Sequence, residues 1–153
     1  MGVNKSRRPE LAPYFETPLQ MIREARVPLS AAQLQAMFAA PVSILPAPGA
    51  GFALIIDQCE VEIIAGGTAF TGGGAISFVY HGVSGSNPHS GSIPATALTT
   101  AVGTTVIELG PPTPTNGLTI PANTGLDITN ATAAFASGNG SAVALVQYRI
   151  IQL

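Results

Sequence analysis

The stretch that most restricts the possible folds of this chain is residues 52–81, where β-branched and aromatic residues are interrupted by clusters of glycine. Residues 52–64 predict one long strand, because alternate side chains of a strand point to opposite faces of its sheet. Apolar residues occupy both faces of this strand, so it is either central to a sandwich or covered by a second copy of the protein. Strict alternation places Leu54, Ile56, Glu60 and Glu62 on one face and Ile55, Asp57, Cys59, Val61 and Ile63 on the other.

A second strand is predicted at residues 75–81, where Ile76, Phe78 and Tyr80 share one face. The glycines between the two strands accept the positive φ that tight turns require. We therefore expect residues 52–81 to form two strands joined through a glycine-rich turn, with the other strands packed on this ribbon.

The composition favours short strands over helices. The 153 residues include 17 glycines, 13 prolines and no tryptophan, and Thr, Val and Ile are abundant, which is typical of strands joined by tight turns. Turn signals every eight to twelve residues predict roughly eight strands. The last of these, residues 142–151, is apolar on both faces and should be central. We predict an all-β fold: residues 41–153 form a β-sandwich of jelly-roll type, preceded by an extended N-terminal arm.

The chain is poor in charge. Only 9% of its residues are charged, whereas about 25% are charged in an ordinary soluble domain. A small monomer normally stays soluble through surface charge. The low charge therefore indicates that part of the surface is buried against neighbouring copies.

The N-terminal arm, residues 1–40, has a charge different from that of the body. Residues 1–26 have a net charge of +2, and the rest of the chain has −4. Thr17 and Pro18 predict a short helix that extends to about Ala25, and Ser30 can cap another that extends to Ala40. Both helices are shorter than the ~12 to 15 residues that a helix needs to persist alone, so we expect them to dock on a body or a neighbour.

We expect the arm to be the main attachment device, with apolar anchors and basic residues in contact with a neighbour. No aromatic interleaving or RNA-binding motif accompanies the basic residues, so nucleic acid is not the expected partner. The apolar runs are too short to span a bilayer, and no membrane partner is expected. The expected contact residues are Lys5, Arg7, Arg8, Leu11, Tyr14, Phe15, Leu19, Met21, Ile22, Arg23 and Arg26.

The sequence contains no convincing catalytic or metal-binding constellation. His81 and His89 are eight residues apart in a polar loop, with Asp57, Glu60 and Glu62 as their nearest candidate carboxylate partners, and this is not a metal-ligand spacing. Glu60 and Glu62 are interpreted either as a solvated edge of the sheet or as a hydrogen-bonding position between subunits. Cys59, in the middle of a predicted strand, is interpreted as a buried apolar residue. We predict no enzymatic activity, no metal and no cofactor.

Several segments resemble small decoration (cement) proteins of tailed bacteriophage heads. The resemblance lies in ILPAPGAG at residues 44–51, in TAFTGGG at 68–74 with the following strand that ends at Tyr80, and in NTGLDIT and VQYRII near the C-terminus. It covers about residues 42–153 and does not explain residues 1–40. It implies a β-sandwich or jelly-roll body that forms a homotrimer on the outer surface of a phage head and bridges capsomers.

The leading hypothesis is therefore a structural virion protein. The resemblance implies synthesis in the host cytoplasm and assembly on the phage head surface, with the major capsid protein and further copies of this chain as partners. The alternative is a tail-associated receptor- or glycan-binding jelly-roll module, in which the polar loop at residues 82–92 would form the site. A hydrolase is a distant third.

Overall fold

Two long strands form the centre of the molecule. In the computed structural model, which describes residues 21–82, 91–109 and 120–153, β3 (Phe52–Ile64) pairs along its length with β9 (Ser141–Gln152). The edge strands β1 (Arg23–Leu29) and β6 (Thr104–Leu109) complete a four-stranded antiparallel sheet in the order β1-β9-β3-β6. The long strand predicted at residues 52–64 and the central position predicted for the last strand are both confirmed.

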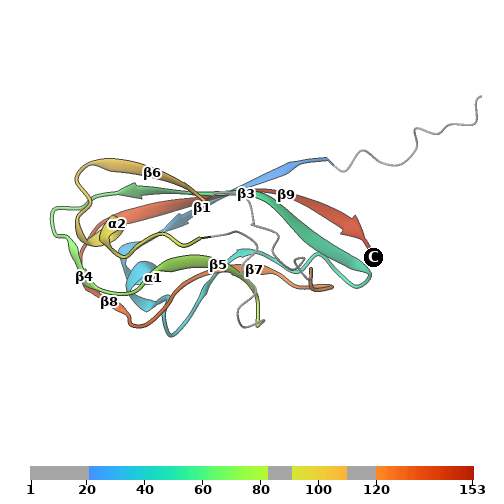
Figure 1. The fold of residues 1–153 in the computed structure, drawn as a ribbon, viewed down its shortest axis with the longest axis horizontal. Coiled ribbons are helices and arrows are strands. Elements are labelled where there is room, and N and C mark those ends of the chain that lie inside the picture. The colour runs from blue at the N-terminus through green and yellow to red at the C-terminus, as the bar shows by residue number, and fades with distance from the viewer. Residues whose placement is uncertain (1–20, 83–90, 110–119) are drawn as a thin grey trace, which may run out of the picture.

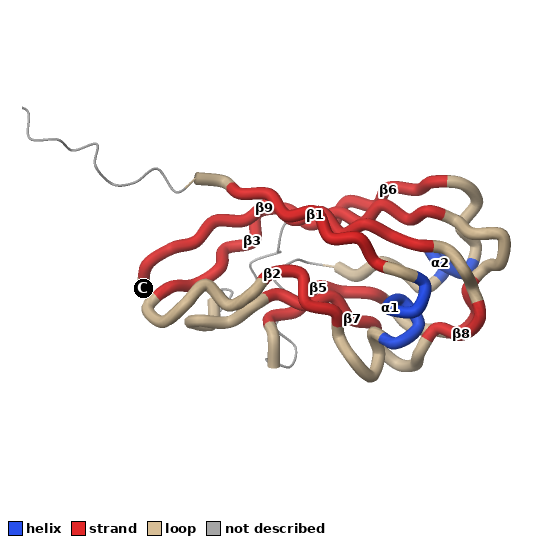
Figure 2. Tube along the Cα trace, turned by 180° about the vertical axis from the view of Figure 1, so that it is seen from behind, coloured by secondary structure: helices blue, strands red, loops and turns tan. Residues whose placement is uncertain are grey.

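A second, smaller sheet faces the first. It has three antiparallel strands in the order β2-β7-β5, and the two sheets form the two layers seen in Figures 1 and 2. One end of the molecule is closed by the two-stranded pair β4-β8 and the short helices α1 and α2 (Figure 1). The all-β fold is confirmed. The remaining bounds are β2 (Val42–Leu45), β4 (Phe70–Gly72), β5 (Ile76–Tyr80), β7 (Leu126–Asn130), β8 (Phe135–Ser137), α1 (Ala31–Ala36) and α2 (Thr96–Thr99).

The two strands predicted to form one ribbon lie in different sheets. β3 pairs with β9 and β6, whereas β5 pairs with β7 in the opposite layer. The glycine-rich residues between them therefore cross from one layer to the other, and the predicted ribbon is wrong. Sequence proximity favours a hairpin, but β3 gains a longer apolar partner in β9.

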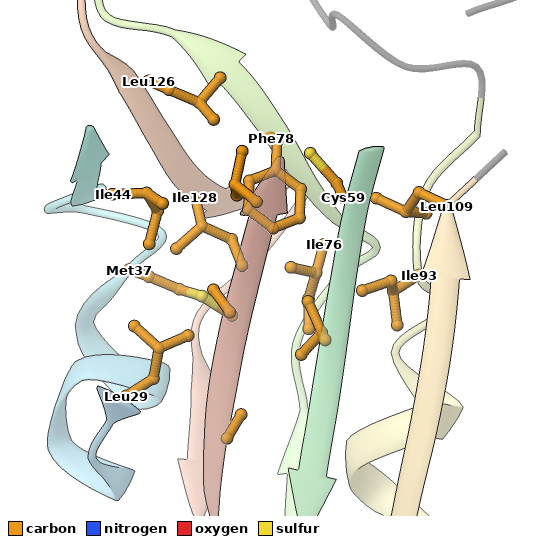
Figure 3. Packing of buried hydrophobic residues seen from close by; sticks show 14 of the residues in the cluster. Leu29, Met37, Ile44, Cys59, Ile76, Phe78, Ile93, Leu109, Leu126 and Ile128 are labelled. Atoms are coloured by element: carbon orange, nitrogen blue, oxygen red, sulfur yellow. The ribbon is translucent and has the colours of Figure 1, made fainter. Parts of the chain in front are cut away.

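The core fills the space between the two sheets (Figure 3). Cys59 of β3 and Phe78 of β5 are fully buried and approach each other from opposite layers. Tyr80 is also buried, and its hydroxyl donates a hydrogen bond to the carbonyl oxygen of Leu54 at 2.8 Å. This bond joins the two layers and satisfies a polar group that would be costly to bury alone.

A β-bulge at Asp57 decides which side chains of β3 face the core. The register with β9 shifts between Ile56 and Gln58, and an extra residue in one strand reverses the faces of all residues beyond it. The assignment from strict alternation is therefore wrong after residue 56. The residues of β3 that belong to the core on both sides of the bulge are Leu54, Ile56, Cys59, Val61 and Ile63.

The start of the described chain is a strand and not the end of a helix. Residues 23–29 pair with β9, with Leu29 buried and Ala25 and Val27 packed against the core. The helix predicted to reach about Ala25 is therefore wrong from Arg23 onward, because edge pairing with a long central strand outweighs a local capping signal. Residues 1–20 lie outside the described part of the chain.

The second predicted helix is present but shorter. Ser30 caps α1 in a capping box: its hydroxyl accepts from the Gln33 N–H at 3.3 Å, and the Gln33 side chain accepts from the Ser30 N–H at 2.9 Å. Leu34 and Met37 are buried, whereas Phe38 is 45% exposed. Leu29 of β1, Leu34 of α1 and Met37 directly after α1 belong to the same hydrophobic core as the strands of the two sheets.

Two glycines with positive φ let the end of the sandwich close around an aromatic pair. The rings of Phe70 and Phe135 meet edge to face, with centroids 6.0 Å apart. A Cβ at Gly73 would lie 2.1 Å from the Phe135 ring, and one at Gly138 would lie 2.5 Å from the Phe70 ring. The backbone can approach both rings only because these residues have no side chain.

Candidate interaction surface

The most unusual surface of the described chain is the outer face of the four-stranded sheet, on the side away from the second layer. Because the side chains of β3 that alternate with the buried ones point outward, Glu60 and Glu62 lie on this face. The register brings side chains from all four strands beside them. We call this set the outer face: Glu24, Arg26, Gln58, Glu60, Glu62, Ile64, Val106, Glu108, Val143, Leu145 and Gln147.

A shallow hollow lies in the middle of the outer face and has a volume of about 130 Å³. Leu145 and Gln147 come from β9, Gln58 and Glu60 from β3, and Glu24 from β1. The lining therefore combines two carboxylates and two amides around one apolar side chain. We call it the acidic hollow.

The charges around the acidic hollow are only partly compensated. Arg26 forms an ion pair with Glu62 at 3.0 Å, and the Gln58 side chain donates to Glu108 at 2.9 Å. Glu60 lies directly opposite Glu108 in the β3–β6 ladder, an arrangement of like charges that destabilises a sheet. Within the described ranges, neither Glu24 nor Glu60 forms an ion pair.

Beside the carboxylates runs an apolar strip. It consists of Ile64, Val106, Val143 and Leu145, and its members come from β3, β6 and β9. Val106 is 55% exposed and Ile64 is 38% exposed. A sheet face that meets only water normally has polar side chains at such positions, so this strip is suited to contact with another surface.

A second charged pair fixes the bulge and is not available to a partner. The Arg149 guanidinium contacts both carboxylate oxygens of Asp57, with its Nε at 2.9 Å from Oδ2 and its Nη2 at 2.6 Å from Oδ1. These hydrogen bonds to Asp57 raise the pKa of Arg149. The pair holds the bulged residue in place and leaves the net charge of the outer face unchanged.

The structure also places a histidine beside a buried carboxylate. Asp127 of β7 is 4% exposed, and its Oδ2 lies 2.6 Å from Nδ1 of His81, whose side chain is 73% exposed. This geometry directs Nε2 of the imidazole toward solvent. None of the carboxylates that the sequence suggested for His81, namely Asp57, Glu60 and Glu62, is its partner, because all three lie on the opposite sheet. His89 lies outside the described residues.

Cys59 is placed where a thiol cannot act as a surface nucleophile. Its side chain is fully buried between the sheets, and burial raises the pKa of the thiol. Burial raises the pKa of Tyr80 to about 12. Both groups are therefore protonated at neutral pH and pack as core residues.

In residues 21–82, 91–109 and 120–153, no three His, Cys, Asp or Glu side chains gather in a way that could hold a metal ion. The helices of this part of the chain are too short to cross a membrane. Comparison with known proteins adds no identification. No family model, no curated protein and no solved structure matches this chain.

The predicted contact residues fall into two groups. Lys5, Arg7, Arg8, Leu11, Tyr14, Phe15 and Leu19 lie outside the described residues. The remaining four lie at the start of the body: Met21 and Ile22 are 76% and 64% exposed, and Arg23 and Arg26 belong to β1. Among these four, only Arg26 reaches the outer face, where it binds Glu62.

Sequence reasoning missed the acidic hollow as a unit. It named Glu60 and Glu62 as the solvated edge of a sheet, whereas both lie on a central strand. Glu24 and Glu108 come from strands distant in sequence, and only the pairing of β1 and β6 brings them near. The detectable signal was the alternation Gln58, Glu60, Glu62 within an apolar strand.

Proposed function

We propose that this protein is a structural virion protein that decorates the outer surface of a phage head as a homotrimer and stabilises the head by bridging capsomers. The observation that best supports this proposal is the outer face, where an apolar strip and unpaired carboxylates lie side by side on a central sheet. A chain with only 9% charged residues would keep such a surface covered in its working state.

Assembly explains the distribution of side chains better than catalysis does. Within residues 21–82, 91–109 and 120–153, no hydroxyl or thiol forms a hydrogen bond with the His81–Asp127 pair. A decoration protein needs only a rigid body with complementary surfaces. Two facing sheets with a cross-layer hydrogen bond supply that rigidity. We propose no cofactor, nucleic acid or membrane partner, and a jelly-roll order of connections for the sandwich.

In this proposal, the protein is made in the host cytoplasm and the N-terminal arm attaches the trimer to its surroundings. Since β1 begins at Arg23, the part of the arm free to reach a neighbouring copy or the major capsid protein is residues 1–22. Apolar anchors should dominate this attachment, because each exposed ion pair contributes only ~0 to 1 kcal/mol.

The copy number and position of the chain in purified particles test the proposal. Hundreds of copies on the head surface at threefold positions are expected. A few copies at a single vertex would contradict decoration and favour a tail protein. Deleting residues 1–20 should leave the sandwich folded and reduce occupancy measured by gel densitometry. The truncation must end before Arg23, because a longer one removes part of β1.

A receptor- or glycan-binding tail module is the second candidate. The observation in its favour is the His81–Asp127 pair, which presents an oriented imidazole directly before residues 83–90. Imidazole and carboxylate groups can bind sugar hydroxyls through hydrogen bonds. Glycan-array binding that is lost in His81→Ala, together with low copy number in particles, would favour this function over decoration.

A further inference from the structure

We propose that the N-terminal residues 1–20 of one copy bind the outer face of a neighbouring copy, with Lys5, Arg7 and Arg8 at the acidic hollow and the apolar arm residues on the apolar strip. This inference rests on the self-association in the proposed function and identifies the surface that receives the arm. It does not depend on whether the resulting oligomer binds a capsid.

The charges of the two surfaces are complementary. The outer face has four carboxylates, Glu24, Glu60, Glu62 and Glu108, against the single guanidinium of Arg26. Residues 1–8 contain three basic side chains and no acid. A basic segment at the hollow would reduce the repulsion between Glu60 and Glu108. It would also form ion pairs with Glu24 and Glu60, which have none within the described ranges. The Glu60–Glu108 repulsion therefore destabilises the free chain, and binding of a basic segment removes this destabilisation.

The apolar residues are complementary as well. The apolar strip begins at Leu145 in the hollow and continues to Val143. Glu62 lies between Val143 and Val106 in the two ladders, so the strip passes around Glu62 to Ile64 and Val106 at one end of the sheet. In the arm, the basic residues are followed, after Pro9 and Glu10, by apolar residues at positions 11, 14, 15 and 19, with one further acid at Glu16. A basic group beside an apolar group in the arm thus faces an acidic group beside an apolar strip on the outer face, and one extended segment can contact both.

The direction of β1 favours a neighbouring copy over the same copy. Arg23 pairs with Tyr148, whereas Leu29 pairs with Ala142. The chain therefore enters β1 from the end of the sheet near the C-terminus (Figure 1) and runs toward the apolar strip. An arm that covered the strip of its own copy would have to reverse direction before Arg23. A neighbour placed beyond this end could receive the arm without a reversal, and such head-to-tail contacts form a ring where the rotation between copies closes.

The test uses two charge-reversed forms of the full chain. The arm form has Arg7→Glu and Arg8→Glu, and the face form has Glu24→Lys and Glu60→Lys. Each should weaken self-association roughly tenfold or more at low salt in analytical ultracentrifugation, because several charge contacts change sign together. A control with Ala32→Lys and Ala39→Lys adds positive charge at exposed positions near α1, away from the outer face, and should associate like the unmodified chain.

A mixing experiment distinguishes exchange between copies from folding back. The face form keeps an intact arm, and a chain lacking residues 1–20 keeps an intact face. If the arm binds a neighbour, each is monomeric alone and the mixture forms a heterodimer. Absence of a heterodimer would overturn the inference. Native mass spectrometry separates the two chains by mass and reads this result directly.

The remaining outcomes are also decisive. A face form that folds and associates like the unmodified chain would overturn the inference but leave a trimeric decoration protein intact. If the face form fails to fold, the arm form still tests the contact, because its changes lie outside the sandwich. The unmodified chain could also decorate particles and yet stay monomeric in solution, with its own arm protecting β3 from hydrogen exchange at all concentrations. That result would overturn the binding of the arm to a neighbouring copy and would leave the decoration function unaffected.

Discussion

Replacing Glu60 by Gln should stabilise the folded chain, although Glu60 lies on a central strand. Glu60 and Glu108 face each other across the ladder, so their Cβ atoms are about 5 Å apart. With the carboxylates at ~6 Å in water, Coulomb's law gives a repulsion of about 0.7 kcal/mol. The substitution removes this repulsion and keeps the shape of the side chain. The melting temperature should rise by about 1.5–3 °C, since 1 kcal/mol corresponds to about 2–4 °C for a chain of this size.

Glu62→Gln is the matched control, two residues along the same strand and on the same face. Glu62 binds Arg26 at 3.0 Å, so its replacement should lower the free energy of unfolding by ~0 to 1 kcal/mol. Both effects are electrostatic and should become smaller as the salt concentration rises. Between about 0.01 M and 1 M the Debye length falls from about 30 to 3 Å, which reduces the Glu60–Glu108 repulsion at ~6 Å to roughly a sixth. Thermal unfolding at two ionic strengths and two protein concentrations separates these effects from association. If Glu60→Gln were destabilising, or its effect were independent of salt, the argument that the outer face is strained by like charges would be wrong.

Two further predictions concern the core and its closure. Tyr80→Phe should lower the free energy of unfolding by about 1–2 kcal/mol in urea titrations, because the buried Leu54 carbonyl loses its 2.8 Å hydrogen bond. Burial raises the pKa of Tyr80 from 10.0 to about 12, so the unfolded chain loses this proton first. The contribution of Tyr80 to the free energy of unfolding is therefore complete below pH 10 and is lost as the pH rises toward 12. Tyr80→Phe should lack this contribution. If its free energy of unfolding fell between pH 10 and 12 as much as that of the unmodified chain, Tyr80 would not be the group responsible. Gly138→Ala should lower the free energy of unfolding by about 1–3 kcal/mol, because the new residue would have a positive φ and a Cβ placed 2.5 Å from the Phe70 ring. Gly82→Ala, which has positive φ but nothing within 4 Å of the new Cβ, should cost less and is the control; equal costs would show that the clash does not matter.

The sequence predicted those parts of the fold that depend on local pattern. The long strand β3 and the central position of β9 follow from runs of β-branched residues that are too apolar on both faces for an edge position. The Ser30 cap was also predictable, because a capping box involves only residues three apart. These features need no knowledge of which strands pair.

The features that the sequence did not reveal depend on pairing between distant residues. The bulge at Asp57 changes every facing assignment after it, and only its pairing with Arg149 and the register of β9 reveals it. β1 was predicted as the end of a helix because its alternation is short and its partner lies far away along the chain. The acidic hollow was missed for the same reason, since three strands contribute to it.

On the outer face, the apolar strip favours binding, and the carboxylates restrict which partners can bind. An outer face composed only of Ile64, Val106, Val143 and Leu145 would adhere to other apolar sheets, and the length of β3 and β9 would favour such stacking. Glu60 and Glu108 prevent this, because burying them against an apolar partner leaves two like charges without water or a counter-ion. A partner that places a basic group at the hollow avoids this penalty and still covers the strip. The Glu60–Glu108 pair therefore destabilises the free chain by a fraction of a kcal/mol. It weakens the binding of a wholly apolar partner by a larger free energy, and unfavourable contacts of this kind make binding selective.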